Sequence, residues 1–115
     1  SAIQNGDFSS VAGTWRNRSG IEFTFDKNGL VSDKSKISIE HVKEIDHYLK
    51  ANSVSKDGGA GAAIAFLPAG IPITMSVTSS TDNGYTDSSD ITQDRLWFGQ
   101  QLINGSTEGF FYKVE

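Results

Sequence analysis

Residues 8–31, FSSVAGTWRNRSGIEFTFDKNGLV, decide the fold class of this chain. Within this stretch, residues 21–25 (IEFTF) alternate apolar and polar side chains, so the three apolar ones share one face of a strand. The Asn28-Gly29 pair that follows readily takes positive φ, the backbone conformation that a tight hairpin turn requires. The stretch therefore predicts the opening hairpin of an antiparallel β domain, with Trp15 as its buried plug.

Length and composition limit the kind of protein this can be. A chain of 115 residues fits one domain with a core of its own. The net charge of −4 and the scattered basic residues argue against a nucleic-acid surface, which concentrates Lys and Arg. The absence of cysteine excludes a disulfide scaffold, a thiol nucleophile and a Cys-ligated metal. No apolar stretch reaches the roughly 18 residues of a membrane span.

Turn signals recur along the chain and separate short apolar runs. This spacing predicts an all-β fold, a small antiparallel barrel of about eight strands that occupies residues 8–115 as a single domain. Residues 8–11 are expected to form one helical turn, and residues 1–7 read as a flexible leader without an anchor. The clearest expected strands cover residues 13–17, 20–26, 48–55, 61–67, 71–77, 95–100 and 109–114.

Residues 36–45, KISIEHVKEI, fit two interpretations. Ile37 and Ile39 alternate as in a strand, whereas Val42 and Ile45 break that phase and fit a helical face. The β-branched content and the strand-rich surroundings favour a strand with a bulge or turn directly after it. Residues 48–55 would then be its hairpin partner.

A short motif and a longer pattern resemble known families. Gly13-Thr14-Trp15 before the first strand resembles the opening of lipocalin-like and fatty-acid-binding barrels. This resemblance implies that Trp15 closes one end of the barrel and that a late cation packs on its ring, Arg95 first and Lys113 second.

The longer pattern runs through GDFSSVAGTWRN, GIEFTFDKNG, LPAGIPI, DRLWFGQ and FFYKV. It resembles a domain of unknown function found in surface lipoproteins of Gram-positive bacteria. The resemblance implies an extracellular domain anchored to the cell envelope through a lipidated Cys that precedes the domain. It brings no catalytic residues with it.

The acidic segment 82–94 is a candidate ion site. Its carboxylates and amide offer the hard oxygens that Ca²⁺ selects. Their spacing does not match the calcium loop, and a solvated loop whose Asx turns satisfy its own backbone explains them. The residues concerned are Asp82, Asn83, Asp87, Asp90 and Asp94.

His41 and His47 are the two histidines of the chain. A zinc site would need a third ligand such as Glu44 or Asp46 near both. A hydrolase would need one of them beside a carboxylate and a hydroxyl, and no Gly-x-Ser-x-Gly elbow exposes a serine. We therefore expect no metal, no cofactor and no catalysis, with a histidine-dependent hydrolase as a minor alternative.

Trp97 and Phe111 are the candidates for a binding surface. They fall out of phase with their aromatic neighbours, so both faces of the last two strands are apolar. Either a loop or helix covers one face, or an aromatic patch is exposed to a partner.

We expect a non-enzymatic cell-surface domain that binds a small apolar ligand at the barrel mouth or an envelope protein at this patch. Trp15 and Arg95 are the further candidate binding residues. The alternative is a structural module of an envelope lipoprotein with a filled core and no ligand. Contact with a membrane would be made through the lipid anchor alone.

Overall fold

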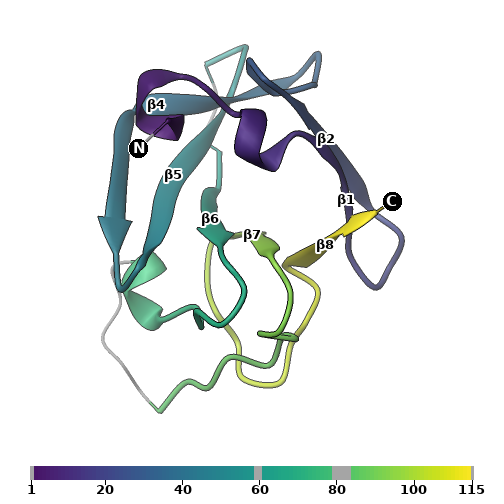
Figure 1. Cartoon of the computed structure of the whole chain (residues 1–115), viewed down its shortest axis with the longest axis vertical. Helices are drawn as coiled ribbons and strands as arrows, with labels where there is room; N and C mark the ends of the chain where they lie inside the picture. The colour runs from purple at the N-terminus through teal and green to yellow at the C-terminus, as the bar shows by residue number, and fades with distance from the viewer. Residues whose placement is uncertain (1, 59–60, 79–83, 115) are drawn as a thin grey trace.

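The computed structural model of the chain describes residues 2–58, 61–78 and 84–114. Over these residues the fold is all-β, as the alternation predicted: eight antiparallel strands form one sheet that curls into a nearly closed barrel (Figure 1). Three short 3-10 helices accompany them: η1 (Ile3–Asn5), η2 (Ser9–Val11) and η3 (Met75–Thr78). The strands are β1 (Gly13–Arg16), β2 (Glu22–Asp26), β3 (Gly29–Leu30), β4 (Ser35–Ile45), β5 (Tyr48–Ser55), β6 (Ala63–Leu67), β7 (Arg95–Gly99) and β8 (Phe110–Val114).

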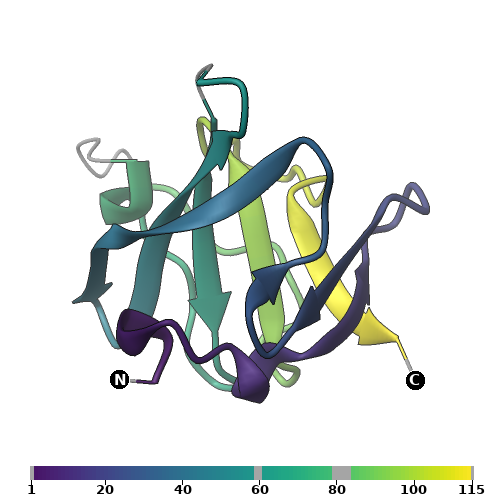
Figure 2. The same ribbon diagram turned by 90° about the horizontal axis from the view of Figure 1, so that it is seen from above.

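The strands follow an up-and-down order. The sheet runs β3-β2-β1-β8-β7-β6-β5-β4, so strands adjacent in sequence are paired except β3 and β4, and β1 also pairs with β8. The two edge strands, β3 and β4, approach each other across the remaining seam. Helices η1 and η2 lie across one end of the barrel, as Figure 2 shows from the side. That end of the barrel is therefore covered by the N-terminal residues of the chain.

Aromatic side chains fill much of the interior. Phe23 lies between two other rings, 4.4 Å from the Phe98 centroid and 4.9 Å from that of Phe111. Phe8, from the start of η2, packs 6.1 Å from Phe25 and 6.3 Å from Phe66. Buried ring pairs of this kind contribute about 0.5–1.5 kcal/mol each beyond their area burial. The inner core comprises Ile3, Phe8, Trp15, Phe25, Ile37, Ala51, Ile64, Phe66, Leu96 and Phe111.

A second apolar cluster lies on the outside of β5 to β8. Trp97 and Phe110 are direct cross-strand partners, so their side chains share this outer face. The long β6–β7 connection, which carries η3 in Figure 1, covers it. The outer cluster comprises Tyr48, Ala65, Leu67, Ile73, Val77, Trp97 and Phe110.

The predicted strand at residues 71–77 is wrong. This segment is irregular and ends in η3. Pro72 has no N–H to donate to a ladder, and the Ile73 N–H donates to the Asp87 carboxylate at 2.8 Å instead of to a strand. The alternating apolar residues are buried all the same, because Ile73 and Val77 face the outer cluster. The alternation over residues 71–77 therefore indicated which side chains are buried, but it did not indicate a paired strand.

Residues 2–7 belong to the segment that the sequence suggested as a flexible leader, and they include a core side chain. Ile3 is 4% exposed and belongs to the inner core. Helix η1 closes with Gly6 in the left-handed region at φ 84°, its N–H donating to the Ile3 carbonyl. Ile3 therefore packs this segment against the barrel end, and the Gln4 side-chain amide also donates to the Val42 carbonyl of β4 at 3.4 Å.

The strand interpretation of residues 36–45 is confirmed, and the hairpin with β5 turns at Asp46-His47. Both turn residues have positive φ, 48° and 75°, the backbone of a two-residue hairpin loop of the primed type. Hydrogen bonds of Thr74 with Asp46 and Tyr48 hold the turn to the β6–β7 connection. Thr74 Oγ1 donates to the Asp46 carboxylate, and it shares a 3.0 Å hydrogen bond with the Tyr48 hydroxyl.

Candidate functional site

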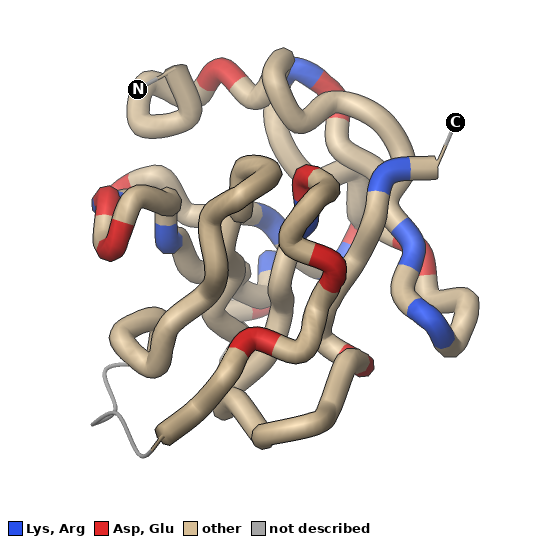
Figure 3. Tube along the Cα trace, turned by 60° about the horizontal axis from the view of Figure 1, so that its bottom comes forward, with Lys and Arg blue, Asp and Glu red and all other residues tan. Residues whose placement is uncertain are grey.

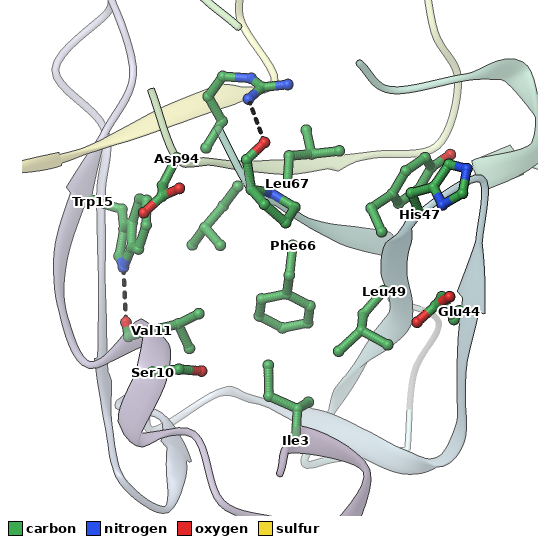
Figure 4. Close-up of a pocket in the computed structure, with 14 residues that line it drawn as sticks. Ile3, Ser10, Val11, Trp15, Glu44, His47, Leu49, Phe66, Leu67 and Asp94 are labelled. Atoms are coloured by element: carbon green, nitrogen blue, oxygen red, sulfur yellow. Dashed lines mark hydrogen bonds between the residues drawn. The ribbon is translucent and has the colours of Figure 1, made fainter. Parts of the chain in front are cut away.

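The candidate site is a cavity of about 350 Å³ that opens at the η1–η2 end of the barrel (Figure 4). Its wall is mainly apolar and comes from helices η1 and η2 and from strands β1, β4, β5, β6 and β7. We call it the barrel-end cavity. Its lining residues are Ile3, Ser10, Val11, Trp15, Glu44, His47, Tyr48, Leu49, Phe66, Leu67, Pro68, Asp94, Arg95 and Leu96.

Trp15 is fixed at the side of this cavity. Its indole N–H donates to the Val11 carbonyl at 2.9 Å, which joins β1 to η2 (Figure 4). The ring is 3% exposed, so it packs as the predicted plug. The cation over its face is Lys113, with Nζ 5.9 Å from the ring centroid. The first choice for this cation, Arg95, is wrong because Lys113 is the direct cross-strand partner of Trp15.

Polar side chains from two loops stand at the cavity's edge. Glu44 and His47 come from the β4–β5 hairpin, and Asp94 directly precedes β7 (Figure 4). Asp94 Oδ1 accepts the Ala69 N–H at 2.9 Å, which fixes that carboxylate in place. Both carboxylates belong to exposed residues. The edge of the cavity therefore carries two carboxylates beside one imidazole.

Arg95 borders the same cavity but is already fully bonded. Its guanidinium donates to Ser89 Oγ at 2.9 Å and to Asp87 Oδ2 at 3.5 Å. Three backbone carbonyls accept the remaining N–H groups, those of Pro68 (3.3 Å), Gln93 (2.7 Å) and Ile71 (2.5 Å). Five donors thus meet five acceptors, which is the full capacity of the group. Arg95 holds three loop segments together and leaves no donor for a ligand.

Trp97 and Phe111 do not form the expected exposed patch. Each is 3% exposed. The register pairs Phe111 with Leu96 and Trp97 with Phe110, so the two residues face opposite sides of the sheet. Phe111 belongs to the inner core and Trp97 to the covered outer cluster. Of the two possibilities left open by the sequence, the covering loop is the one observed.

In the described part of the acidic segment, Asp87 and Asp90 accept hydrogen bonds from N–H groups of the same loop. Asp87 accepts the N–H of Ser89 at 2.7 Å, and Asp90 accepts that of Thr92 at 3.0 Å. The Thr92 and Gln93 hydrogen bonds lower the pKa of Asp90 below its usual value. Acidic positions recur along this segment in Figure 3. Asp82 and Asn83 lie outside the described residues, and among those described no three His, Asp or Glu side chains are grouped to hold a metal.

The two histidines line different hollows of the protein surface. His41 lies in an irregular part of β4 and lines a separate hollow, whereas His47 stands at the barrel-end cavity. In the part of the chain that the structure describes, neither imidazole has a hydrogen bond to a carboxylate or a hydroxyl.

Sequence reasoning missed the residues that shape the cavity. Ile3, Val11, Leu49 and Leu96 come from four different elements. For Ile3 the sequence holds one indication of burial, because it is an isolated apolar residue in a polar segment. The others look like ordinary core positions of their strands.

The chain was compared with known proteins. No curated protein and no solved structure matches it. Over the described residues, none of the helices has the length and apolar character needed to cross a bilayer. One family model, described as a domain of unknown function (DUF6287), matches residues 1–115. The chain belongs to this family.

Proposed function

We propose that this chain is a non-enzymatic binding domain that takes a small apolar ligand into the barrel-end cavity. The observation that carries the proposal is the cavity itself, about 350 Å³ with walls formed by Ile3, Leu49 and Phe66 among others. Ligand pockets commonly span about 300–1,000 Å³ and are mostly apolar with a few polar groups. This volume suits a small molecule or one short acyl chain.

The charges at the edge of the cavity limit the polar end of the ligand. Glu44 and Asp94 would repel a carboxylate placed at the mouth. A hydroxyl or an amine would instead find acceptors there. The ligand class that fits is a short aliphatic chain with a neutral or cationic head.

The non-enzymatic part of the proposal is supported by the hydrogen bonding. Asp94 is engaged by the Ala69 N–H, and Arg95 is saturated by structural acceptors. Among the described residues, His47 lacks the carboxylate and hydroxyl partners that a hydrolytic relay would need.

The setting that we propose is the outside of a Gram-positive cell, with the domain tethered to the envelope by a lipid anchor. The support is the sequence resemblance to domains of surface lipoproteins, together with the Gly13-Thr14-Trp15 opening shared with lipocalin-like barrels. The second candidate function is a structural module without a ligand. The observation that favours it is the aromatic packing around Phe23, which fills the barrel beyond the cavity.

A titration followed by methyl NMR tests the proposal. Octanol or octylamine should shift the methyl signals of Ile3, Val11 and Leu49 in a saturable way, and octanoate should bind more weakly. Ser10→Trp places a large ring at the mouth from an exposed position and should abolish binding. Arg18→Trp, in the exposed β1–β2 turn, is the matched control and should leave binding unchanged.

Equal shifts in both variants, or no saturable shift in the wild type, would overturn the binding proposal. The absence of any shift with all three compounds would leave the structural module as the better account.

A further inference from the structure

Strand β4 contains a large bulge. Its register with β5 pairs Ser38 with Asn52 and resumes at Lys43 with Lys50. Residues 39–42 of β4 therefore lie opposite one residue of β5, Ala51. Bulges interrupt the ladder, re-aim side chains and are over-represented near functional sites.

The bulge opens a hollow of about 330 Å³ beside the two strands. Its lining is His41, Val42, Lys43, Lys50 and Asn52, which we call the bulge hollow. Among the described residues no carboxylate lines it, although the chain as a whole has a net charge of −4. A concentration of cationic and donor groups on an acidic protein is a local feature that the overall charge does not explain.

Lys43 and Lys50 are direct cross-strand partners. Like charges at directly opposed positions destabilise a sheet, and a carboxylate at one of them would have been the stabilising choice. In the described part of the chain neither lysine has an ion pair; the salt bridges there join Arg16 to Glu22 and Arg95 to Asp87. The nearby Glu44 lines the barrel-end cavity instead.

Lys50 is also partly withdrawn from water. Burial, and then the charge of Lys43, lower the pKa of its ammonium group. Lys50 and Asn52 in addition line an adjoining hollow beside η3. The cost of holding two ammonium groups in this position falls once an anion lies between them.

We propose that the bulge hollow is an anion-binding site that takes a phosphate group between the side chains of Lys43 and Lys50. Two ammonium groups match the charge of a phosphate better than that of a single carboxylate. The Asn52 amide and the His41 ring are the additional hydrogen-bond donors at the site. The site is independent of the apolar ligand proposed above, because the lining residues of the two cavities do not overlap.

A phosphate group can come from a free anion or from a phospholipid headgroup, and two experimental arms separate these sources. The first arm titrates ¹⁵N-labelled protein with inorganic phosphate against sodium chloride of equal ionic strength. The second arm measures co-sedimentation with vesicles of phosphatidylglycerol and of phosphatidylcholine. The variant is Lys43→Gln with Lys50→Gln, and the control is Lys27→Gln with Lys34→Gln, which removes the same charge from exposed positions elsewhere.

We expect saturable amide shifts at residues 41–43 and 50–52 with phosphate, weakened about fivefold or more in the Lys43/Lys50 variant and unchanged in the control. Binding to phosphatidylglycerol vesicles alone, lost in the same variant, would assign the phosphate to a lipid headgroup. Equal binding by both variants in both arms, or no binding in either arm, would overturn the proposal.

A stability measurement gives an independent readout. In chloride, Lys50→Gln should raise the thermal midpoint, because it removes the opposed charge. In phosphate this advantage should shrink or reverse. An advantage that is the same in both salts would contradict anion binding at this site.

Discussion

Replacing Arg95 by Met should destabilise the fold strongly without changing the shape of the barrel. The guanidinium lies at the start of β7, with the side chains of Arg95 and Asp87 0% and 4% exposed. Methionine keeps the aliphatic volume but removes all five donors. The change therefore isolates the hydrogen bonds of Arg95 from its packing.

The size of this loss of stability depends on the acceptor groups that Arg95→Met leaves without a donor. The carbonyls of Pro68, Ile71 and Gln93 lose a charged donor, and the Asp87 carboxylate loses its counter-charge. Removing one member of a buried ion pair costs about 3–5 kcal/mol, and a buried orphaned acceptor costs about 1–3 kcal/mol. Pro68 and Gln93 are exposed residues, so water can replace the donors that their carbonyls lose, and the ion-pair loss of about 3–5 kcal/mol is the total that we expect.

Urea denaturation followed by tryptophan fluorescence measures this loss. The control is Arg16→Met, which breaks a 2.6 Å ion pair whose side chains are 50% and 42% exposed. Exposed pairs contribute about 0–1 kcal/mol, so the control should lose no more than that. A loss below about 1 kcal/mol for Arg95→Met, equal to that of the control, would refute the structural role assigned to Arg95.

Two further predictions concern Tyr85 and the hairpin turn. The buried Tyr85 hydroxyl has no partner among the described residues, and burial, followed by the Asp87 charge, raises its pKa to about 12. Because the folded-state pKa lies above the ordinary value of about 10, the titration of Tyr85 leaves the free energy of unfolding unchanged below pH 10 and lowers it as the pH rises toward 12. Tyr85→Phe should therefore be neutral at pH 8 or raise the free energy of unfolding by up to about 1 kcal/mol. Between pH 8 and pH 11 the variant should lose less stability than the wild type, as measured by urea denaturation. A loss above about 1 kcal/mol in the variant at pH 8 would contradict this reasoning, because it would mean that the hydroxyl has a hydrogen-bond partner. His47→Gly should raise the free energy of unfolding by about 0.5–1 kcal/mol, because the relief of strain at φ 75° outweighs the extra chain entropy that glycine loses on folding. The control is His41→Gly, which lies in strand β4 and should lower the free energy of unfolding. The reverse order of the two variants would contradict the turn assignment.

The strand pattern was predictable where alternating residues pair directly with neighbours on both sides. Residues 20–26 are such a case, because a half-buried strand must alternate. Residues 48–55 were predicted instead as the hairpin partner of the preceding strand, and β5 pairs with β4 in that way. The same signal misled at residues 71–77, where an irregular segment buries Ile73 and Val77 against the outside of the barrel. A period of two reports which side chains are buried and does not identify the surface that buries them.

The site was less accessible to sequence reasoning. A cavity at the barrel end exists because η1, η2 and the β4–β5 hairpin meet there, and these contacts join residues far apart in sequence. Arg95 is visible as a cation, but its five acceptors come from three separate loop segments. The Lys43–Lys50 pair depends on the length of a bulge, which no residue pattern specifies.

The central claim is that the barrel-end cavity holds an apolar ligand, and intermolecular NOEs locate such a ligand directly. With methyl-labelled protein and octanol, we predict NOEs from the alkyl chain to Val11, Leu49 and Leu96, which line the cavity. NOEs confined to exposed residues such as Ile21 and Ile103, or none at saturating octanol, would contradict the claim.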